Sequence, residues 1–369
     1  MIYYYLIFAW SLLLGFIFKK RKEPLLSSTN QRQLVIKKRF DKEYVFLVLI
    51  LCFLLIGFRD ISVGFDTANY VNNTFNSAKY QGTFVNNQEI VISLIARFSM
   101  LFSSDYRLFL VLYAAIIVFL YGYFITQNSN NMLISISIFL GMFFVPSMNL
   151  MREWLAIGFG INAIYFLKNK RYFLYLVLLL LSIFSHVTAV CFLLVSFVFV
   201  VKNKRILFIA VLLICSSIFL LRNQIVDIVI SFVPKYAVYS YSDRFLNDGG
   251  FNVKDLVFLG IIILYSFTLI AKENLTEKQK NDILTYLCLV IIALTFSLCG
   301  GRFNIMHRLV YYFSVYLIIS LPLVISFYDN KRLIYAFVIL AMLVMLFRNQ
   351  ISDNNGISNY LFFWQSTIR

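Results

Sequence analysis

The stretch "YVFLVLILCFLLIGFRDISVGFDTANY", residues 44–70, joins an apolar run to a polar motif. Residues 44–58 carry no charged side chain, whereas Arg59, Asp60 and Asp66 follow within the next eight positions. A helix needs roughly 20 mostly apolar residues to cross a bilayer, and this run approaches that length. The stretch therefore predicts a membrane helix that ends in a polar, charge-bearing segment.

The same pattern recurs along the chain, of which 61% is hydrophobic and only 14% is charged. This composition excludes a water-soluble globular protein and indicates a polytopic membrane protein. Since it never shifts to that of a soluble domain, we expect one integral membrane domain over residues 1–369. The five cysteines lie inside apolar runs without CxxC spacing, so we expect neither a disulfide framework nor a metal site, and no cofactor.

Basic clusters predict the topology, because cytoplasmic loops carry an excess of lysine and arginine. Clusters at residues 19–22, 37–39, 168–171 and 202–205 should all face the cytoplasm. Between the second and third clusters lie five apolar runs. A chain that returns to the same side of the membrane crosses it an even number of times, so one of the five runs does not cross. The weakest is residues 89–102, which are short and in which Ile92, Ile95 and Ala96 fall at helical spacing; we assign it to an amphipathic or re-entrant helix at the outer face. The sequence then predicts an all-α bundle of about twelve spans with both ends outward. In the alternative, residues 89–102 cross the membrane, and the basic cluster at residues 168–171 then lies outside, against the positive-inside rule.

The two predicted faces use different cations: ten arginines and three lysines lie outward, against six arginines and fourteen lysines inward. The inward lysines suit anionic membrane lipid rather than nucleic acid. Arginine binds phosphate bidentately and tolerates partial desolvation, so the outward arginines indicate an anion such as a lipid diphosphate. The alternative is that they pair with outward carboxylates and hold the bundle together. These arginines include Arg59, Arg97, Arg107, Arg152, Arg222, Arg244, Arg302 and Arg308.

Two charged positions near the ends of predicted spans are candidates for chemistry. Asp66 has two interpretations, the cap of a helix through Tyr70 and Phe75 or a carboxylate that orients a sugar hydroxyl and accepts its proton. Arg152 and Glu153 lead directly into a span, where charges cost free energy and are usually paired or functional. The structural alternative for them is a clamp between the two side chains.

His186 lies in "LLLLSIFSHVTAVCFLL", between apolar arms that are short for full spans. The pattern predicts a helical hairpin whose turn, Ser185 and His186, lies below the outer surface in a pocket. A buried histidine with satisfied hydrogen bonds is the usual explanation in a soluble protein, whereas an ionisable residue within a bilayer is by default functional.

Two later segments add weaker signals at the outer face. Residues 297–313 carry paired glycines followed by Arg302, His307 and Arg308, which fits close backbone approach to a ligand or a tight turn with interfacial arginines. Residues 232–253 are rich in tyrosine and contain Arg244, which fits sugar binding or an aromatic belt at the headgroups.

The order of these motifs resembles the EpsG-type family of bacterial exopolysaccharide membrane proteins, regarded as Wzy-like polymerases. The resemblance rests on "GFRDISVGFDTANY", then Glu89, "MNLMREWLAIG", "FSHVTAV" and "GGRFNIMHR". The first motif is fairly specific. The others are short, and they support the resemblance mainly because they occur in the same order along the chain. Two positions depart from the family: Glu153 stands where glutamine is common, and Ile90 stands where a proline often follows the early glutamate.

The resemblance implies a polymerase of the outer face of the cytoplasmic membrane, compatible with a GT-C-like architecture. A growing glycan would pass from undecaprenyl diphosphate to a sugar hydroxyl of the next lipid-linked repeat unit. A chain-length regulator and a flippase of the same pathway are its expected partners. The base for the acceptor hydroxyl is His186 or Asp66, with His186 favoured because an arginine neighbour weakens a carboxylate base. The expected substrate-binding residues are Arg59, Tyr70, Glu89, Arg152, Glu153, Arg244, Arg302, His307 and Arg308.

Outward arginines suit a departing diphosphate, which leaves without needing a general acid. Since no carboxylate pair resembles a DxD metal site, we expect transfer without a metal; loss of activity in a chelator, restored by Mg²⁺, would contradict this. Two rival classes stay open. A lipid-linked oligosaccharide flippase should carry charges along a path on both faces, and a polysaccharide ligase or membrane O-acyltransferase would use a histidine base with a different donor.

Overall fold

The computed structural model describes residues 2–22, 31–81, 90–232, 253–270, 275–300, 306–353 and 355–366. Within these ranges the chain is helical, and its one extended pairing is an isolated antiparallel bridge between Arg59 and Phe362. The prediction of an all-α fold is confirmed. Contact density divides the chain into two compact units, of which the first is Met1–Ala189 with Asp329–Arg369 and the second is Val190–Tyr328. The single integral domain stays a prediction.

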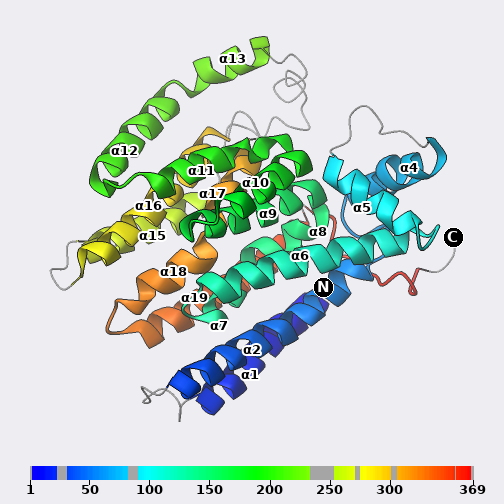
Figure 1. The fold of residues 1–369 in the computed structure, drawn as a ribbon, viewed down its shortest axis with the longest axis horizontal. Coiled ribbons are helices and arrows are strands. Elements are labelled where there is room, and N and C mark those ends of the chain that lie inside the picture. Colours follow the sequence, from blue (N-terminus) through cyan, green and yellow to red (C-terminus); the bar gives the residue numbers. More distant parts are fainter. Residues whose placement is uncertain are drawn as a thin grey trace. The chain divides into compact units, whose positions relative to one another are not determined.

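The first unit contains long apolar helices joined by short helical segments (Figure 1). Its long helices pack in sequence, α2 against α6, α6 against α9, and α9 against α10. The helices of this unit are α1 (Ile2–Lys22), α2 (Gln31–Gly57), α3 (Thr67–Asn69), η2 (Tyr70–Phe75), α4 (Asn76–Gln81), α5 (Ile90–Met100), α6 (Tyr106–Asn128), α7 (Met132–Ile138), η3 (Phe139–Phe143), α8 (Phe144–Asn149), α9 (Met151–Lys168), α10 (Tyr172–Ser185) and α19 (Lys331–Ile351).

Hydrogen bonds from buried polar side chains join these helices. Such bonds set the position of one helix along its neighbour, which apolar packing alone does not determine. The Tyr113 hydroxyl of α6 donates to the Ser147 carbonyl of α8 at 2.6 Å, and the Ser182 hydroxyl of α10 donates to the Ala156 carbonyl of α9 at 2.6 Å. Hydrogen bonds of this kind contribute to helix association in lipid, where there is no hydrophobic driving force between helices. They join α8 to α6 and α10 to α9, and these helices carry the motifs singled out in the sequence.

Gly141, in the π-helical turn η3, lets α19 approach closely. A Cβ atom at this position would lie 2.7 Å from the Met342 carbonyl oxygen and 3.0 Å from the Met342 Cα. Backbone atoms cannot turn aside, so Gly141→Ala is expected to destabilise the fold by about 1–3 kcal/mol. Thermal unfolding of the purified protein in detergent micelles measures the effect.

Gly260 supplies the matched control for that substitution. Apart from its chain neighbours and the backbone of its own helix, no described atom lies within 4 Å of the position that its Cβ would take. Gly260→Ala is therefore expected to leave stability unchanged or to raise it by about 0.5–1 kcal/mol, because alanine loses less backbone entropy in a helix. Equal melting temperatures for Gly141→Ala and the wild type would contradict the close packing of η3 on α19.

The second unit is built around α16 (Glu277–Cys299), which packs against α11, α12, α15, α17 and α18. A capping box starts this helix, since the Thr276 hydroxyl accepts from the Gln279 amide and the Gln279 side chain accepts from the Thr276 amide. The other helices of this unit are α11 (Cys191–Val200), α12 (Lys204–Leu220), α13 (Arg222–Phe232), α15 (Val253–Ile270), α17 (Met306–Ser314) and α18 (Leu317–Ser326).

Among the described residues, five helices are long and apolar enough to cross a membrane, and a sixth span results if a pair bent by 42° counts as one. The larger number of spans stays a prediction, because several other apolar helices have only 10–17 residues. The five are Ile2–Lys20, Tyr106–Asn128, Met132–Asn149, Glu277–Cys299 and Lys331–Ile351, and the bent pair is Arg308–Ser314 with Leu317–Ser326.

The short helix predicted within residues 89–102 is present as α5, Ile90–Met100. Its 11 residues span about 16 Å, roughly half of the hydrocarbon thickness. One face, which includes Ile92 and Ala96, is buried, whereas Leu94 and Phe98 are exposed. This is the two-sided helix that the spacing indicated, and its place at the outer face stays a prediction.

Candidate functional site

The polar motif that follows α2 is held by a segment near the other end of the sequence. Residue 353 and residues 355–365, which we name the C-terminal clasp, include the segment that runs beside residues 58–65. The Asp60 amide donates to the Leu361 carbonyl at 2.9 Å, and the Gly64 amide donates to the Gly356 carbonyl at 2.8 Å. Gly64 has φ of +92°, a left-handed conformation that side chains disfavour, so glycine is required at this contact. The clasp therefore fixes the backbone of the motif.

Arg59 lies beneath this contact and is fully buried. Its guanidinium donates to the Ile56 carbonyl at 2.6 Å, to the Thr67 hydroxyl at 3.4 Å and to the Met151 Sδ at 3.3 Å. No carboxylate of the described residues pairs with it, and burial lowers the pKa of the guanidinium. Arg59 thus joins the end of α2 to the start of α9, which favours a structural role over contact with a ligand.

Arg59→Lys is expected to destabilise the first unit by about 1–3 kcal/mol, since a single ammonium cannot reproduce the fork that reaches three acceptors. Denaturation in detergent, followed by the near-ultraviolet signal of the buried aromatic residues, measures the loss. Arg107→Lys is the matched control, because Arg107 is half-exposed on the ring of Phe363 and pairs with Asp105 at 3.6 Å. An exposed pair contributes little. Equal losses for the two variants would contradict the structural role of Arg59.

Asp60 is also used within the motif. Its carboxylate accepts from the Ser62 hydroxyl at 2.7 Å and from the Ser62 amide at 3.0 Å. Burial on its own raises the pKa of this carboxyl, but the hydrogen bonds to the charged form together hold the pKa below its ordinary value. Asp60 therefore stays charged and closes the turn after α2.

The motif docks on the break between α8 and α9. Leu150 leaves the helical conformation, with φ −86° and ψ 61°, so that α9 begins at Met151. The buried Asn149 side chain accepts a hydrogen bond from the Asp66 amide at 2.8 Å. Asp66 precedes α3 in a helical conformation and makes no side-chain cap, so the first of its two interpretations, the helix cap, is wrong. Asp66 itself is half-buried.

Arg152 and Tyr70 meet at this junction. The Arg152 Nε donates to the Tyr70 hydroxyl at 3.3 Å, and its guanidinium carbon lies 5.4 Å from the centre of the Tyr70 ring. Burial raises the pKa of the Tyr70 hydroxyl and Arg152 opposes that shift, while the charges of Asp66 and Glu153 act on the same hydroxyl. The charges of Arg152, Asp66 and Glu153 therefore all act on the Tyr70 hydroxyl. Arg152 is half-buried.

The imidazole of His186 reaches the same place from α10. Its Nε2 lies 3.4 Å from Oε1 of Glu153, which is buried in the first turn of α9. His186 ends α10 with an extended backbone, φ −162° and ψ 129°, as expected for a turn at residues 185–186, whereas the hairpin and its depth stay predictions. Its side chain is 17% exposed. When Nε2 carries the proton and faces the carboxylate, Nδ1 is left as the proton acceptor of a neutral imidazole.

The structure thus brings together five of the eleven predicted site residues, Asp66, Tyr70, Arg152, Glu153 and His186, which we name the polar cluster. Arg59 lies beneath it. Arg308 belongs to the second unit and is exposed. Glu89, Arg244 and Arg302 lie outside the described residues, as does the side chain of His307. Their predicted roles stay predictions.

Asn149 and the C-terminal clasp were not among the predicted site residues. Asn149 lies between Met148 and Leu150 and carries no charge. Its residue type therefore did not indicate a contact with the motif after α2. The clasp residue Asp353 accepts hydrogen bonds from the Ile357 amide at 2.7 Å and the Ser358 amide at 2.9 Å, which fold the clasp. No periodic pattern in residues 353–365 indicates that contact.

The cluster contains one imidazole and two carboxylates, but it does not form a group of three potential ligands close enough for a metal ion, and no other part of the described chain does. Its chemistry is that of a proton acceptor, held by a carboxylate, next to an arginine. Such a set can remove a proton from a hydroxyl and stabilise negative charge that develops beside it.

Comparison with known proteins identifies the family. The sequence model of the EpsG family matches residues 42–362, which contain the motif after α2, the polar cluster and most of the C-terminal clasp. No curated protein and no solved structure matches the chain. The family resemblance stated from the motifs is confirmed. The chain therefore belongs to the EpsG family and is a membrane protein of polysaccharide biosynthesis.

Proposed function

We propose that this protein is a polysaccharide polymerase of the bacterial cytoplasmic membrane. It transfers a growing glycan from undecaprenyl diphosphate to a sugar hydroxyl of the next lipid-linked repeat unit on the outer face. The observation that carries the proposal is the contact between His186 and Glu153 at 3.4 Å, beside the half-buried Arg152. Family membership supports the pathway, and the cluster supports the reaction.

The acceptor hydroxyl oxygen attacks the anomeric carbon of the donor glycan, and the bond from that carbon to the diphosphate oxygen breaks. The hydroxyl proton passes to Nδ1 of His186, and the resulting imidazolium is stabilised by the Glu153 carboxylate. Arg152 stabilises the charge that develops on the departing undecaprenyl diphosphate. The imidazolium then releases its proton to water, which restores the cluster. Asp66 orients the acceptor hydroxyl.

The membrane topology forms part of the proposal. The loops at residues 168–171 and 202–205 face the cytoplasm, and the short apolar helices α10 and α11 complete a bundle of about twelve spans together with the longer ones. The helix α10 starts just after the first of these loops and ends at His186 after 14 residues. Its length corresponds to about 21 Å, so His186 lies below the outer surface rather than in bulk water.

The proposal is tested with purified protein in proteoliposomes that contain a synthetic undecaprenyl-diphosphate repeat unit. We expect glycan chains that lengthen with time, with release of one undecaprenyl diphosphate for each bond formed. Lengthening should fail in Arg152→Ala and His186→Ala at matched protein levels. If labelled lipid instead crosses the bilayer without a new glycosidic bond, the protein is a flippase and the proposal is wrong.

A further inference from the structure

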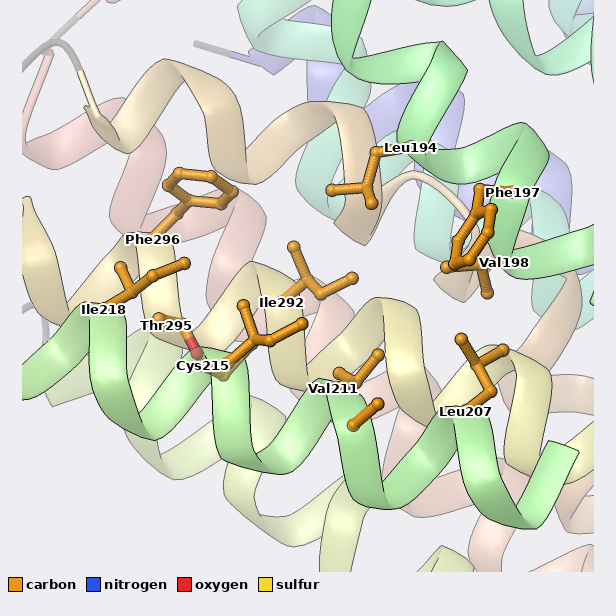
Figure 2. A pocket seen from close by; sticks show the side chains of 12 residues that line it. Leu194, Phe197, Val198, Leu207, Val211, Cys215, Ile218, Ile292, Thr295 and Phe296 are labelled. Atoms are coloured by element: carbon orange, nitrogen blue, oxygen red, sulfur yellow. The ribbon is translucent and has the colours of Figure 1, made fainter.

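An apolar groove lies in the second unit between α11, α12 and α16 (Figure 2). Its floor is buried and includes Val198, Val211 and Ile292, whereas Phe197 and Ile214 on its rim are each 58% exposed. The space measures about 120 Å³ and opens at the protein surface. A dry cavity of about 150 Å³ with such a lining binds benzene, so this one suits a short stretch of hydrocarbon.

The lining offers almost nothing to a polar ligand. The Thr295 hydroxyl, one of two polar groups among the lining residues, donates to the Ile291 carbonyl of its own helix at 2.9 Å. Along α12 the groove extends from Leu207 to Ile218, about 16 Å, or roughly half of the hydrocarbon thickness of a bilayer. The groove therefore fits a segment of a lipid chain that runs along the helices.

A cation lies just beyond one end of the groove. Arg222 begins α13, four positions after the groove residue Ile218 of α12. It donates to the Phe219 carbonyl at 3.1 Å, lies over the Phe219 ring at 4.8 Å, and pairs with no carboxylate of the described chain. An apolar groove that ends at an arginine is complementary to a lipid with an anionic head.

We propose that this groove binds part of the isoprenoid chain of the polyprenyl-diphosphate carrier, with Arg222 contacting a phosphate. The inference rests on the proposed function for the identity of the lipid. It assigns to the second unit, taken by itself, the binding of hydrocarbon from the carrier. Because guanidinium binds phosphate through two parallel hydrogen bonds, Arg222 would also set how far the chain enters.

Photocrosslinking of the full-length protein in phosphatidylglycerol nanodiscs tests the inference. The probe is undecaprenyl phosphate with a diazirine in its isoprenoid chain, and the labelled peptides are mapped by mass spectrometry. We expect labels on α11, α12 or α16 that unlabelled undecaprenyl phosphate displaces. Labels confined to other helices, or equal displacement by added phosphatidylglycerol, would overturn the inference.

Two pairs of variants sharpen that experiment. Ala210→Trp fills the groove and should lower labelling about tenfold, whereas Leu213→Trp, on the lipid-facing side of the same helix, should leave it unchanged. Arg222→Gln should also lower labelling about tenfold, and Arg222→Lys less. Labelling of Ala210→Trp and Arg222→Gln equal to that of the wild type and of Leu213→Trp would contradict the inference.

The labelling does not depend on turnover, so the two proposals fail separately. A protein that elongates glycan but is labelled elsewhere would overturn the groove and leave the polymerase standing. A protein that is labelled in the groove but only moves lipid across the bilayer would overturn the polymerase and leave the groove standing.

Discussion

His186→Ala is expected to lower the rate of glycan elongation by about 10²–10⁴-fold, the usual contribution of a positioned general base. The imidazole is the one group of the polar cluster whose neutral form accepts a proton readily near neutral pH. Elongation measured under single-turnover conditions in proteoliposomes gives the ratio. Added imidazole should restore part of the activity of His186→Ala, which a purely structural loss would not allow.

We propose that Glu153 positions His186 through their contact at 3.4 Å, and Glu153→Gln tests this role. In metal sites, where such carboxylate partners of histidine have been measured, their loss costs about 10–100-fold. Glu153→Gln is expected to fall in that range, with the folded state retained. Glu277→Gln is the matched control, because Glu277 forms an exposed pair with Arg205 at 3.2 Å. A loss in Glu153→Gln no larger than in Glu277→Gln would contradict the assignment of Glu153.

Arg152→Ala is expected to lower elongation by about 10²–10³-fold, the cost of removing one group that stabilises developing negative charge. The reason lies in its position, since it is half-buried beside Tyr70 and within the neighbourhood of Asp66 and Glu153. Arg152→Lys should recover part of the loss, because it keeps the charge but lacks the planar fork.

The form of the loss distinguishes chemistry from binding. If Arg152 acts on the leaving group, kcat falls while KM for the lipid-linked donor changes less. Arg205→Ala removes an arginine from an exposed pair and should change neither constant. A rise in KM with unchanged kcat would show that Arg152 contributes only to binding of the ground state.

The sequence predicted the helical fold because its causes are local. Composition and apolar runs indicated membrane helices, the spacing of Ile92 and Ala96 indicated the short helix α5, and the polar pair at residues 185–186 indicated the end of α10. The contact of residues 58–65 with the C-terminal clasp has no such signal. It joins segments about 300 residues apart through backbone groups, which any residue types can supply.

The site was predicted in its parts but not in its connections. Arg152, Glu153 and His186 stood out because ionisable residues next to apolar runs are costly. That Glu153 faces His186 depends on how α9 packs against α10, which the buried bond from Ser182 to Ala156 fixes. Arg59 looked like a ligand contact by residue type alone. Its burial beneath the motif depends on carbonyl, hydroxyl and sulfur acceptors that the pattern of the sequence does not reveal.

One round of transfer between two synthetic undecaprenyl-diphosphate-linked repeat units, placed with the protein in proteoliposomes, tests the central claim most directly. The wild type should form a doubled glycan and release an equal amount of undecaprenyl diphosphate, and His186→Ala should form less than about one hundredth as much in the same time. Equal product from the wild type and His186→Ala, or no new glycosidic bond in either, would contradict the assignment of the polar cluster as the site of polymerisation.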